Sequence, residues 1–80
     1  MKDIKVYTSD NCGACKLLKS YLSASGIKFK EVNLNSPEKI NQFIEETGTR
    51  TIPVVSYNGK HIIGFDRNEI DALAKLVLGD

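Results

Sequence analysis

The sequence predicts an α/β fold, with a four-stranded mixed sheet, helices on both faces and the element order β-α-β-α-β-β-α. Runs with the two-residue period of strands alternate with longer runs that have the period of helices. In the first half, a strand, a helix and a second strand form a βαβ unit with parallel strands. In the second half, Asn58-Gly59 separates two apolar runs, which is the strongest short signal for a β-hairpin. A βαβ half followed by a ββα half gives the mixed sheet.

The first half supplies three elements. Residues 4–8 alternate and are rich in β-branched and aromatic residues, which predicts the first strand. From Cys12 onward the apolar residues recur at helical spacing, and Gly26 stands where a glycine commonly ends a helix. Residues 28–34 predict the second strand, although their alternation slips, so its ends are loosely defined.

The second half supplies a helix and the hairpin. Ser36, Pro37 and Glu38 offer a capping residue, a proline at the first helical position and an acid in the first turn, and Gly48 ends this helix. Its expected inner face consists of Ile40, Phe43, Ile44 and Thr47. The hairpin strands are predicted at residues 53–57 and 60–63.

The last helix has the clearest predicted start. Asp66 and Glu69 have the spacing of a capping box, and Phe65 and Ile70 have that of a hydrophobic staple. The residues expected on its buried stripe are Ile70, Leu73, Ala74 and Val77.

The composition is that of one soluble domain spanning residues 1–80. The hydrophobic fraction is 41%, the charged fraction 26% and the net charge +1, from 11 basic and 10 acidic residues. No basic run indicates nucleic acid, and no segment reads as a signal peptide or a membrane span. We expect a cytoplasmic monomer that binds neither nucleic acid nor membranes. Tyr7, Tyr21 and Phe43 are expected in the core.

The two cysteines, Cys12 and Cys15, form the motif Cys-Gly-Ala-Cys. A bridge across so short a loop constrains little chain entropy, and secreted disulfide-stabilised proteins of this size carry more cysteines. A Cys-x-x-Cys between a strand and a helix of a βαβ unit is a thioredoxin-like redox signature. The pair therefore predicts thiol–disulfide chemistry in a reducing compartment.

The two cysteines are expected to have different roles. Cys12 falls in the first turn of the predicted helix, where backbone N–H groups lack intrahelical partners and the dipole is positive. Both effects stabilise a thiolate, so we expect a lowered pKa for the Cys12 thiol and assign it as the nucleophile. Cys15 is aligned with Leu18 and Leu22, so we expect it to be buried and to resolve the mixed disulfide.

Neighbouring residues are expected to tune the pair. Lys16 favours the Cys12 thiolate, and Asp10 opposes it by Coulomb repulsion. Gly13 and Ala14 tune the motif from within, because a glycine there loosens the turn that a proline would stiffen.

With Cys12-Gly13-Ala14-Cys15, Thr51-Ile52-Pro53 and Gly64 in hand, the chain resembles a glutaredoxin along essentially its whole length. Residues 48–53 and 58–66 look very like the second half of that family. The Gly64-Phe65-Asp66 ending looks closest to bacterial glutaredoxin-like proteins, and its Gly-Phe also occurs in the NrdH-type redoxins that reduce ribonucleotide reductase. The resemblance implies a thioredoxin-like fold and reduction of protein or small-molecule disulfides.

The resemblance also implies a substrate surface around Thr51, Ile52 and Pro53. A cis peptide bond would precede Pro53, which would face the cysteines and leave the backbone of Ile52 free to pair with an extended substrate. The alternative is a proline that only begins a strand.

Glutathione is the co-substrate that the resemblance implies, with no bound cofactor and no metal ligands. Its γ-glutamyl end would bind at Phe65 and Asp66 beside Gly64, through backbone N–H groups at a helix start. Arg50 could meet a carboxylate of the ligand, or lie solvated in its loop. Phe65 and Asp66 also have a sufficient structural reason as staple and cap.

Three departures from the common glutaredoxin pattern argue against efficient use of glutathione. Common glutaredoxins carry Cys-Pro-Tyr-Cys, a lysine at the position of Ser9 and Gly-Gly where this chain has Ile63-Gly64. The alternative reductant is a flavin-dependent thioredoxin reductase. Two other functions stay open: an iron–sulfur or metal-binding module, for which one chain lacks four ligands, and a redox-inactive interaction domain.

Overall fold

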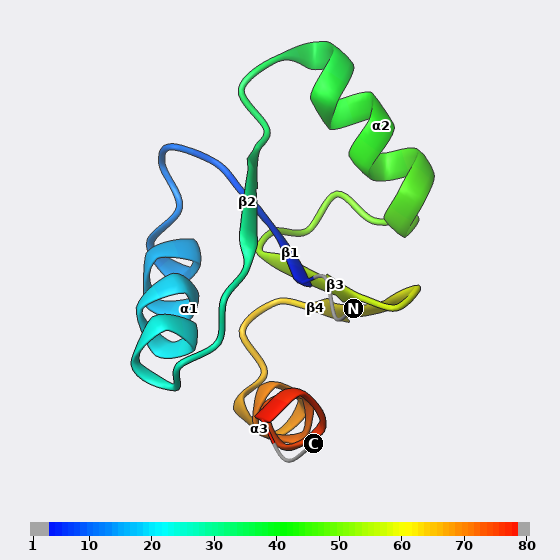
Figure 1. Cartoon of the computed structure of the whole chain (residues 1–80). Helices are drawn as coiled ribbons and strands as arrows, with labels where there is room; N and C mark the ends of the chain where they lie inside the picture. The colour runs from blue at the N-terminus through cyan, green and yellow to red at the C-terminus, as the bar shows by residue number, and fades with distance from the viewer. Residues whose placement is uncertain (1–3, 79–80) are drawn as a thin grey trace.

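The computed structural model, which describes residues 4–78, contains the predicted elements in the predicted order (Figure 1). They are β1 (Ile4–Thr8), α1 (Gly13–Ala24), β2 (Lys30–Asn33), α2 (Pro37–Thr47), β3 (Val54–Tyr57), β4 (Lys60–Ile63) and α3 (Arg67–Leu78). The βαβ unit is β1-α1-β2, and β3-β4-α3 is the ββα half.

The strands form one mixed sheet in the order β2-β1-β3-β4. β1 pairs with β2 in parallel, with Tyr7 opposite Val32, and with β3 in antiparallel, with Tyr7 opposite Val54. β3 and β4 form the expected antiparallel hairpin. β1 therefore lies inside the sheet, and the loop that contains Cys12 follows its carboxyl end.

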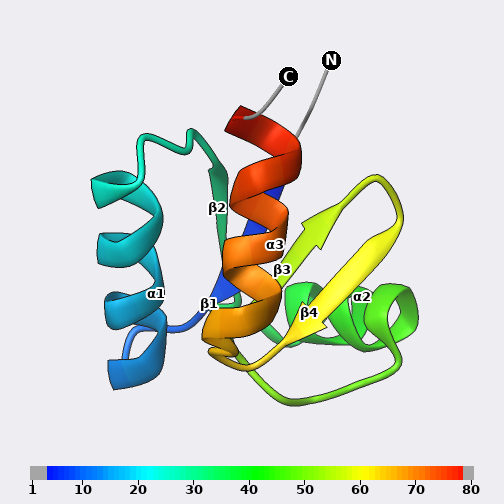
Figure 2. The same cartoon turned by 90° about the horizontal axis from the view of Figure 1, so that it is seen from below.

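The helices divide between the two faces of the sheet (Figures 1 and 2). α1 and α3 cover one face, and α2 covers the other. Alternate residues of β1 follow this division: Val6 packs with the α1 and α3 side, and Tyr7 packs with Phe43 of α2. The core residues of the α1 and α3 side are Ile4, Val6, Leu18, Leu22, Ile27, Val55, Ile62, Ile70 and Leu73. Those of the α2 side are Tyr7, Leu34, Phe43 and Val54.

The capping and turn signals are confirmed. Ser36 Oγ accepts a hydrogen bond from Lys39 N–H at 3.3 Å, and α2 ends at Gly48, whose φ of 73° favours glycine. Asn58 and Gly59 both have positive φ, at 49° and 80°, as a tight hairpin turn requires.

The structure corrects three boundaries or placements. β2 begins at Lys30 rather than at residue 28, and β3 begins after Pro53, because proline has no N–H to donate to a ladder. Ile40, expected on the inner face of α2, is 41% exposed. It lies near the N-terminal end of α2, where it lines an open pocket rather than the core.

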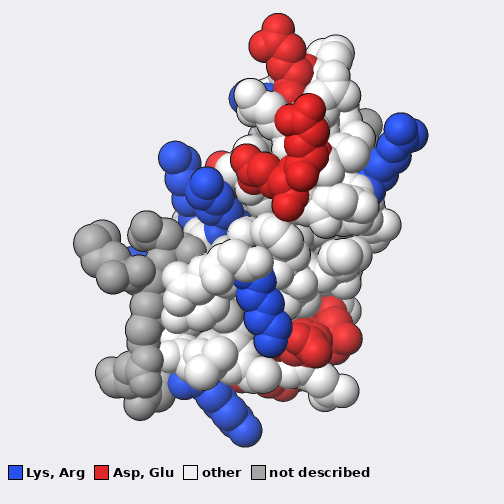
Figure 3. All heavy atoms as spheres, turned by 90° about the vertical axis from the view of Figure 1, so that its right-hand side faces the viewer, with Lys and Arg blue, Asp and Glu red and all other residues white. Residues whose placement is uncertain are grey.

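The surface carries both signs of charge. On the face drawn in Figure 3, acidic side chains gather in the upper part, where α2 lies, and again low on the right, with lysines and arginines scattered around them. α2 contributes the exposed residues Glu38, Glu45 and Glu46. Within residues 4–78 no helix is long and apolar enough to cross a membrane.

Candidate active site

The cysteine pair lies at the start of α1, after the loop that follows β1. Cys12 is the N-cap residue, one position before the helix, with extended backbone angles, and Cys15 is in the first turn. The two are joined as a disulfide, with their Cα atoms 5.2 Å apart. Cys12 is therefore at the helix start, as expected, although it precedes the first helical residue.

The environments of the two sulfur atoms differ. Cys12 is half-buried, whereas Cys15 is only 1% exposed and continues the buried stripe of Leu18 and Leu22. The Cys15 N–H donates a hydrogen bond to Cys12 Sγ at 3.1 Å. One of the unpaired donors of the helix start is thus directed at the sulfur that faces solvent.

A side-chain network fixes the strand end that precedes this loop. Thr8 is fully buried, and its hydroxyl donates to Glu31 Oε2 at 2.7 Å. Lys19 of α1 donates to the same oxygen at 2.9 Å. The Thr8 hydrogen bond, followed by that from Lys19, lowers the pKa of the Glu31 carboxyl. One carboxylate thus joins β1, β2 and α1.

A second contact holds the turn next to Cys12. Asn33 at the end of β2 donates through Nδ2 to Asp10 Oδ1 at 2.8 Å. Sequence reasoning missed both this contact and the Thr8–Glu31–Lys19 network. Their members are 12 to 23 positions apart, so no local spacing signals them.

The structure brings two of the predicted substrate segments together. The Ile52–Pro53 peptide bond is cis, as the family resemblance implied. The Pro53 carbonyl accepts a hydrogen bond from Gly64 N–H at 2.7 Å, so the loop before β3 meets the loop before α3. Thr51 is exposed, and its N–H is bonded to Thr49 Oγ1 at 3.1 Å.

Asp66 has the capping role that the sequence predicted, and Phe65 packs against the core cluster that contains Ile70. Asp66 Oδ1 accepts hydrogen bonds from the N–H groups of Asn68, at 3.1 Å, and Glu69, at 3.3 Å. The ring of Phe65 lies 6.0 Å from that of Tyr21, at the edge of the core that contains Ile70.

Contacts between α1 and α3 hold this loop in place. Tyr21 donates its hydroxyl to Asp71 Oδ1, and the Arg67 guanidinium lies 5.1 Å from the centre of the Tyr21 ring. No sequence signal indicated these pairs.

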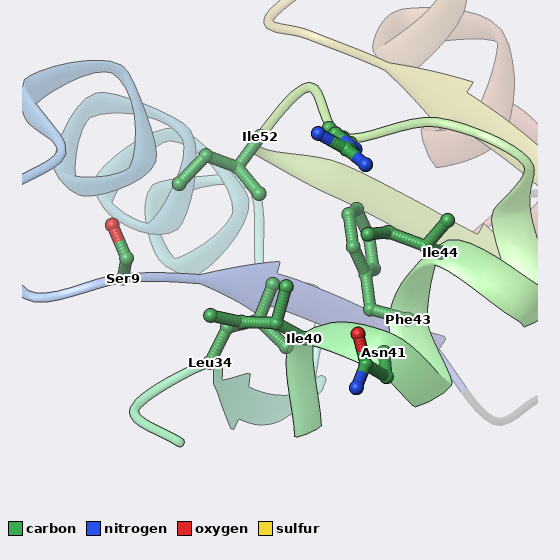
Figure 4. A pocket seen from close by; sticks show the side chains of 8 residues that line it. Ser9, Leu34, Ile40, Asn41, Phe43, Ile44 and Ile52 are labelled. Atoms are coloured by element: carbon green, nitrogen blue, oxygen red, sulfur yellow. The ribbon is translucent and has the colours of Figure 1, made fainter. Parts of the chain in front are cut away.

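Arg50 and Ile52 line the same pocket, together with Ser9, on the α2 side of the sheet (Figure 4). The cavity measures about 390 Å³. Arg50 makes no hydrogen bond or ion pair within the described part of the chain. Among residues 4–78, no three His, Cys, Asp or Glu side chains are grouped so as to hold a metal ion.

A comparison with protein families matches the part of the chain that contains the cysteine pair. The glutaredoxin family model matches residues 4–62, which include both cysteines and Pro53. The chain belongs to the glutaredoxin family. It is therefore an oxidoreductase-family protein of the thioredoxin fold, with the Cys-x-x-Cys pair of that family at disulfide distance.

Named relatives of this glutaredoxin include both branches that the sequence suggested. The glutaredoxin-like protein NrdH of Lactococcus lactis is 32% identical over 71 residues, which cover 89% of this chain and 99% of that protein. Glutaredoxin 3 of Escherichia coli is 30% identical over 67 residues, covering 82% of this chain and 81% of that protein. The solved NrdH-redoxin of Escherichia coli superposes with a TM-score of 0.77 and 25% identity, covering 89% of this chain and 93% of that one.

Proposed function

We propose that this glutaredoxin is a dithiol disulfide reductase in which Cys12 is the nucleophile and Cys15 the resolving cysteine. The observation that carries the assignment is the unequal exposure of the bonded pair. A substrate disulfide can approach the half-buried Cys12 but not Cys15, which is 1% exposed. The N–H of Cys15 also supplies a donor at 3.1 Å from Cys12 Sγ, which favours negative charge on that sulfur after reduction.

The reaction needs two exchange steps. The Cys12 thiolate attacks one sulfur of the substrate disulfide, so a mixed disulfide forms and the other substrate sulfur leaves as a thiolate that takes up a proton. Cys15 then loses its proton and attacks Cys12 Sγ, which releases the second substrate thiol. Two electrons have passed from the dithiol to the substrate, and the Cys12–Cys15 disulfide remains.

Single-cysteine variants test this division of roles. We expect Cys15→Ser to accumulate mixed disulfides on Cys12 when it is incubated with a protein disulfide, because no resolving thiol remains. Cys12→Ser should lose exchange altogether. Mass spectrometry of alkylated samples identifies the adducts. If Cys15→Ser yields no adduct, or if Cys12→Ser still exchanges at the native rate, the assignment is wrong.

For the reductant that restores the dithiol, we propose glutathione. Two observations support this choice: Arg50 offers an unpartnered cation beside Ile52, and the Pro53–Gly64 hydrogen bond joins the two loops at which that ligand would bind. A flavin-dependent thioredoxin reductase is the second candidate. It is favoured by the similarity to NrdH of Lactococcus lactis and by Ser9 in place of the usual lysine.

Coupled turnover separates the two reductants. The oxidised protein is supplied with glutathione, glutathione reductase and NADPH, or with thioredoxin reductase and NADPH, at equal protein concentration. We expect faster NADPH consumption with glutathione. Turnover with thioredoxin reductase alone would reverse the choice of reductant and leave the dithiol chemistry intact.

A further inference from the structure

The pocket beside the active-site loop has mostly apolar walls (Figure 4). These are formed by Leu34, Ile40, Phe43, Ile44 and Ile52. Ile40 is 41% exposed and lines this pocket, so its side chain is available to a ligand. Ser9 adds a hydroxyl rather than a charge.

The pocket lies within reach of Cys12. Ser9 is three residues before Cys12, so their Cα atoms are at most about 11 Å apart. An extended peptide advances about 3.3 Å per residue. A substrate segment whose cysteine reacts at Cys12 can therefore reach this pocket with a side chain two or three positions away.

Charge limits the occupant further. Arg50 is the ionised residue of the lining, and it is exposed and without a partner in residues 4–78. The three glutamates of α2 are not part of the lining. The site therefore offers apolar walls beside a single cation, which suits an apolar side chain followed by a carboxylate.

We propose that this pocket selects protein disulfide substrates, by binding an extended segment with a bulky apolar side chain two or three residues from the reacting cysteine and an acidic side chain beside it. This inference rests on the proposed dithiol chemistry at Cys12. Glutathione has only glycine and a γ-linked glutamate beside its cysteine, so it leaves the apolar walls unfilled. The apolar walls thus favour protein disulfides over the glutathione disulfide as the substrate to be reduced, and glutathione keeps its proposed role as the reductant.

Peptide disulfides test the selection. Each eight-residue peptide contains one cysteine, which forms a disulfide with 2-mercaptoethanol. A leucine lies two or three residues before or after this cysteine, and a glutamate is adjacent to the leucine. Reference peptides carry serine for leucine, or lysine for glutamate. The freshly reduced protein is mixed with each peptide below saturation, and the released peptide thiol is followed by chromatography after acid quenching.

We expect the best leucine peptide to react about tenfold faster than its serine counterpart, within the range for filling an apolar pocket. Ile40→Gln should bring this ratio close to one. Leu76→Gln, which removes an exposed leucine outside the pocket lining, should keep the native ratio. Arg50→Glu should reverse the preference from the glutamate to the lysine peptide.

The outcomes separate the two proposals. Bis(2-hydroxyethyl) disulfide has no side chains to bind, so a native protein that reduces neither it nor any peptide contradicts the dithiol chemistry. A protein that reduces all peptides at equal rates keeps that chemistry and overturns the pocket. The proposed role of the pocket is also wrong if Ile40→Gln and Leu76→Gln lower the leucine-to-serine rate ratio equally.

Discussion

Cys12 and Cys15 are three residues apart in the chain but belong to different environments. The extended backbone of Cys12 leaves its sulfur at the helix start, whereas Cys15 is one turn inside and packs with Leu18 and Leu22. At this scale the sequence predicted the pair correctly, because the spacing and the helical stripe are both local. It missed the partners of Thr8 and Asp10, because those contacts join separate segments.

Tyr7 shows how burial changes a single residue. Its side chain is buried, and burial, with the 2.6 Å hydrogen bond to Glu46, raises its pKa from 10.0 to about 12. The folded state thus keeps this proton at a pH where the unfolded chain releases it. The stability contribution is complete below pH 10 and is lost as the pH rises towards 12, by about 2 kcal/mol.

The difference in absorbance at 295 nm between the native protein and Tyr7→Phe gives the titration curve of Tyr7 alone. We expect a midpoint near 12 and, in urea unfolding, a fall in native stability from pH 9 to 11.5 that is steeper than in Tyr7→Phe. A midpoint at 10 would show that the hydroxyl is not held as the structure indicates.

At the scale of elements, caps and turns were the most predictable features. Ser36, Gly48, Asn58-Gly59 and Asp66 all occupy the predicted positions. Their effect depends on neighbours within four residues, so it can be read from the sequence. The placement of Ile40 was wrong because periodicity gives the face of a helix but not how far the sheet beneath it extends.

Asp66 provides a test of one helix start. Asp66→Ala removes both hydrogen bonds to the N–H groups of Asn68 and Glu69, so we expect it to lower the free energy of unfolding by about 1 kcal/mol. Asp66→Asn keeps the acceptor and should cost much less. Urea unfolding measures both. Equal losses would mean that the charge near the helix, rather than the cap, provides the stability.

Glu31 connects three elements, and its lowered pKa sets the direction of its pH dependence. Its contribution is present above the ordinary glutamate pKa of 4.5 and is lost as the pH falls through the lower folded value. The carboxylate is partly exposed, so we expect less than about 1 kcal/mol.

Glu31→Gln should therefore lose less stability than the native protein between pH 5 and pH 3 in urea unfolding. Glu38→Gln, which changes an exposed glutamate with no contact to Thr8 or Lys19, serves as the matched control. The interpretation fails if the control variant changes the acid slope as much as Glu31→Gln.

For the whole molecule, the two helices on one face of the sheet matter most, because α1 begins at the cysteine pair and α3 follows Gly64. Tyr21 and Asp71 join these helices across 50 positions of sequence. Arg67 and Phe65 contact the same tyrosine ring. The position of the loop before α3 relative to Cys12 therefore depends on a tertiary cluster.

A double-mutant cycle measures this link. We expect Tyr21→Phe and Asp71→Ala to show a coupling of about 1 kcal/mol in urea unfolding, because each removes one side of a partly buried, charged hydrogen bond. Additive losses would mean that the Tyr21–Asp71 hydrogen bond does not help to hold the two helices together.

By itself, the sequence determined the order of the elements, their caps, the turn at Asn58-Gly59 and the reactive pair, because each depends on residues close together in the chain. Only the tertiary structure decided which distant groups meet: the Thr8 hydroxyl with the Glu31 carboxylate, the Gly64 N–H with the Pro53 carbonyl, and Ser9 with Arg50 and Ile52 around one pocket. These contacts require the sheet order β2-β1-β3-β4 and the division of helices between its faces. Local spacing contains no record of them, since packing brings together residues that the chain keeps apart.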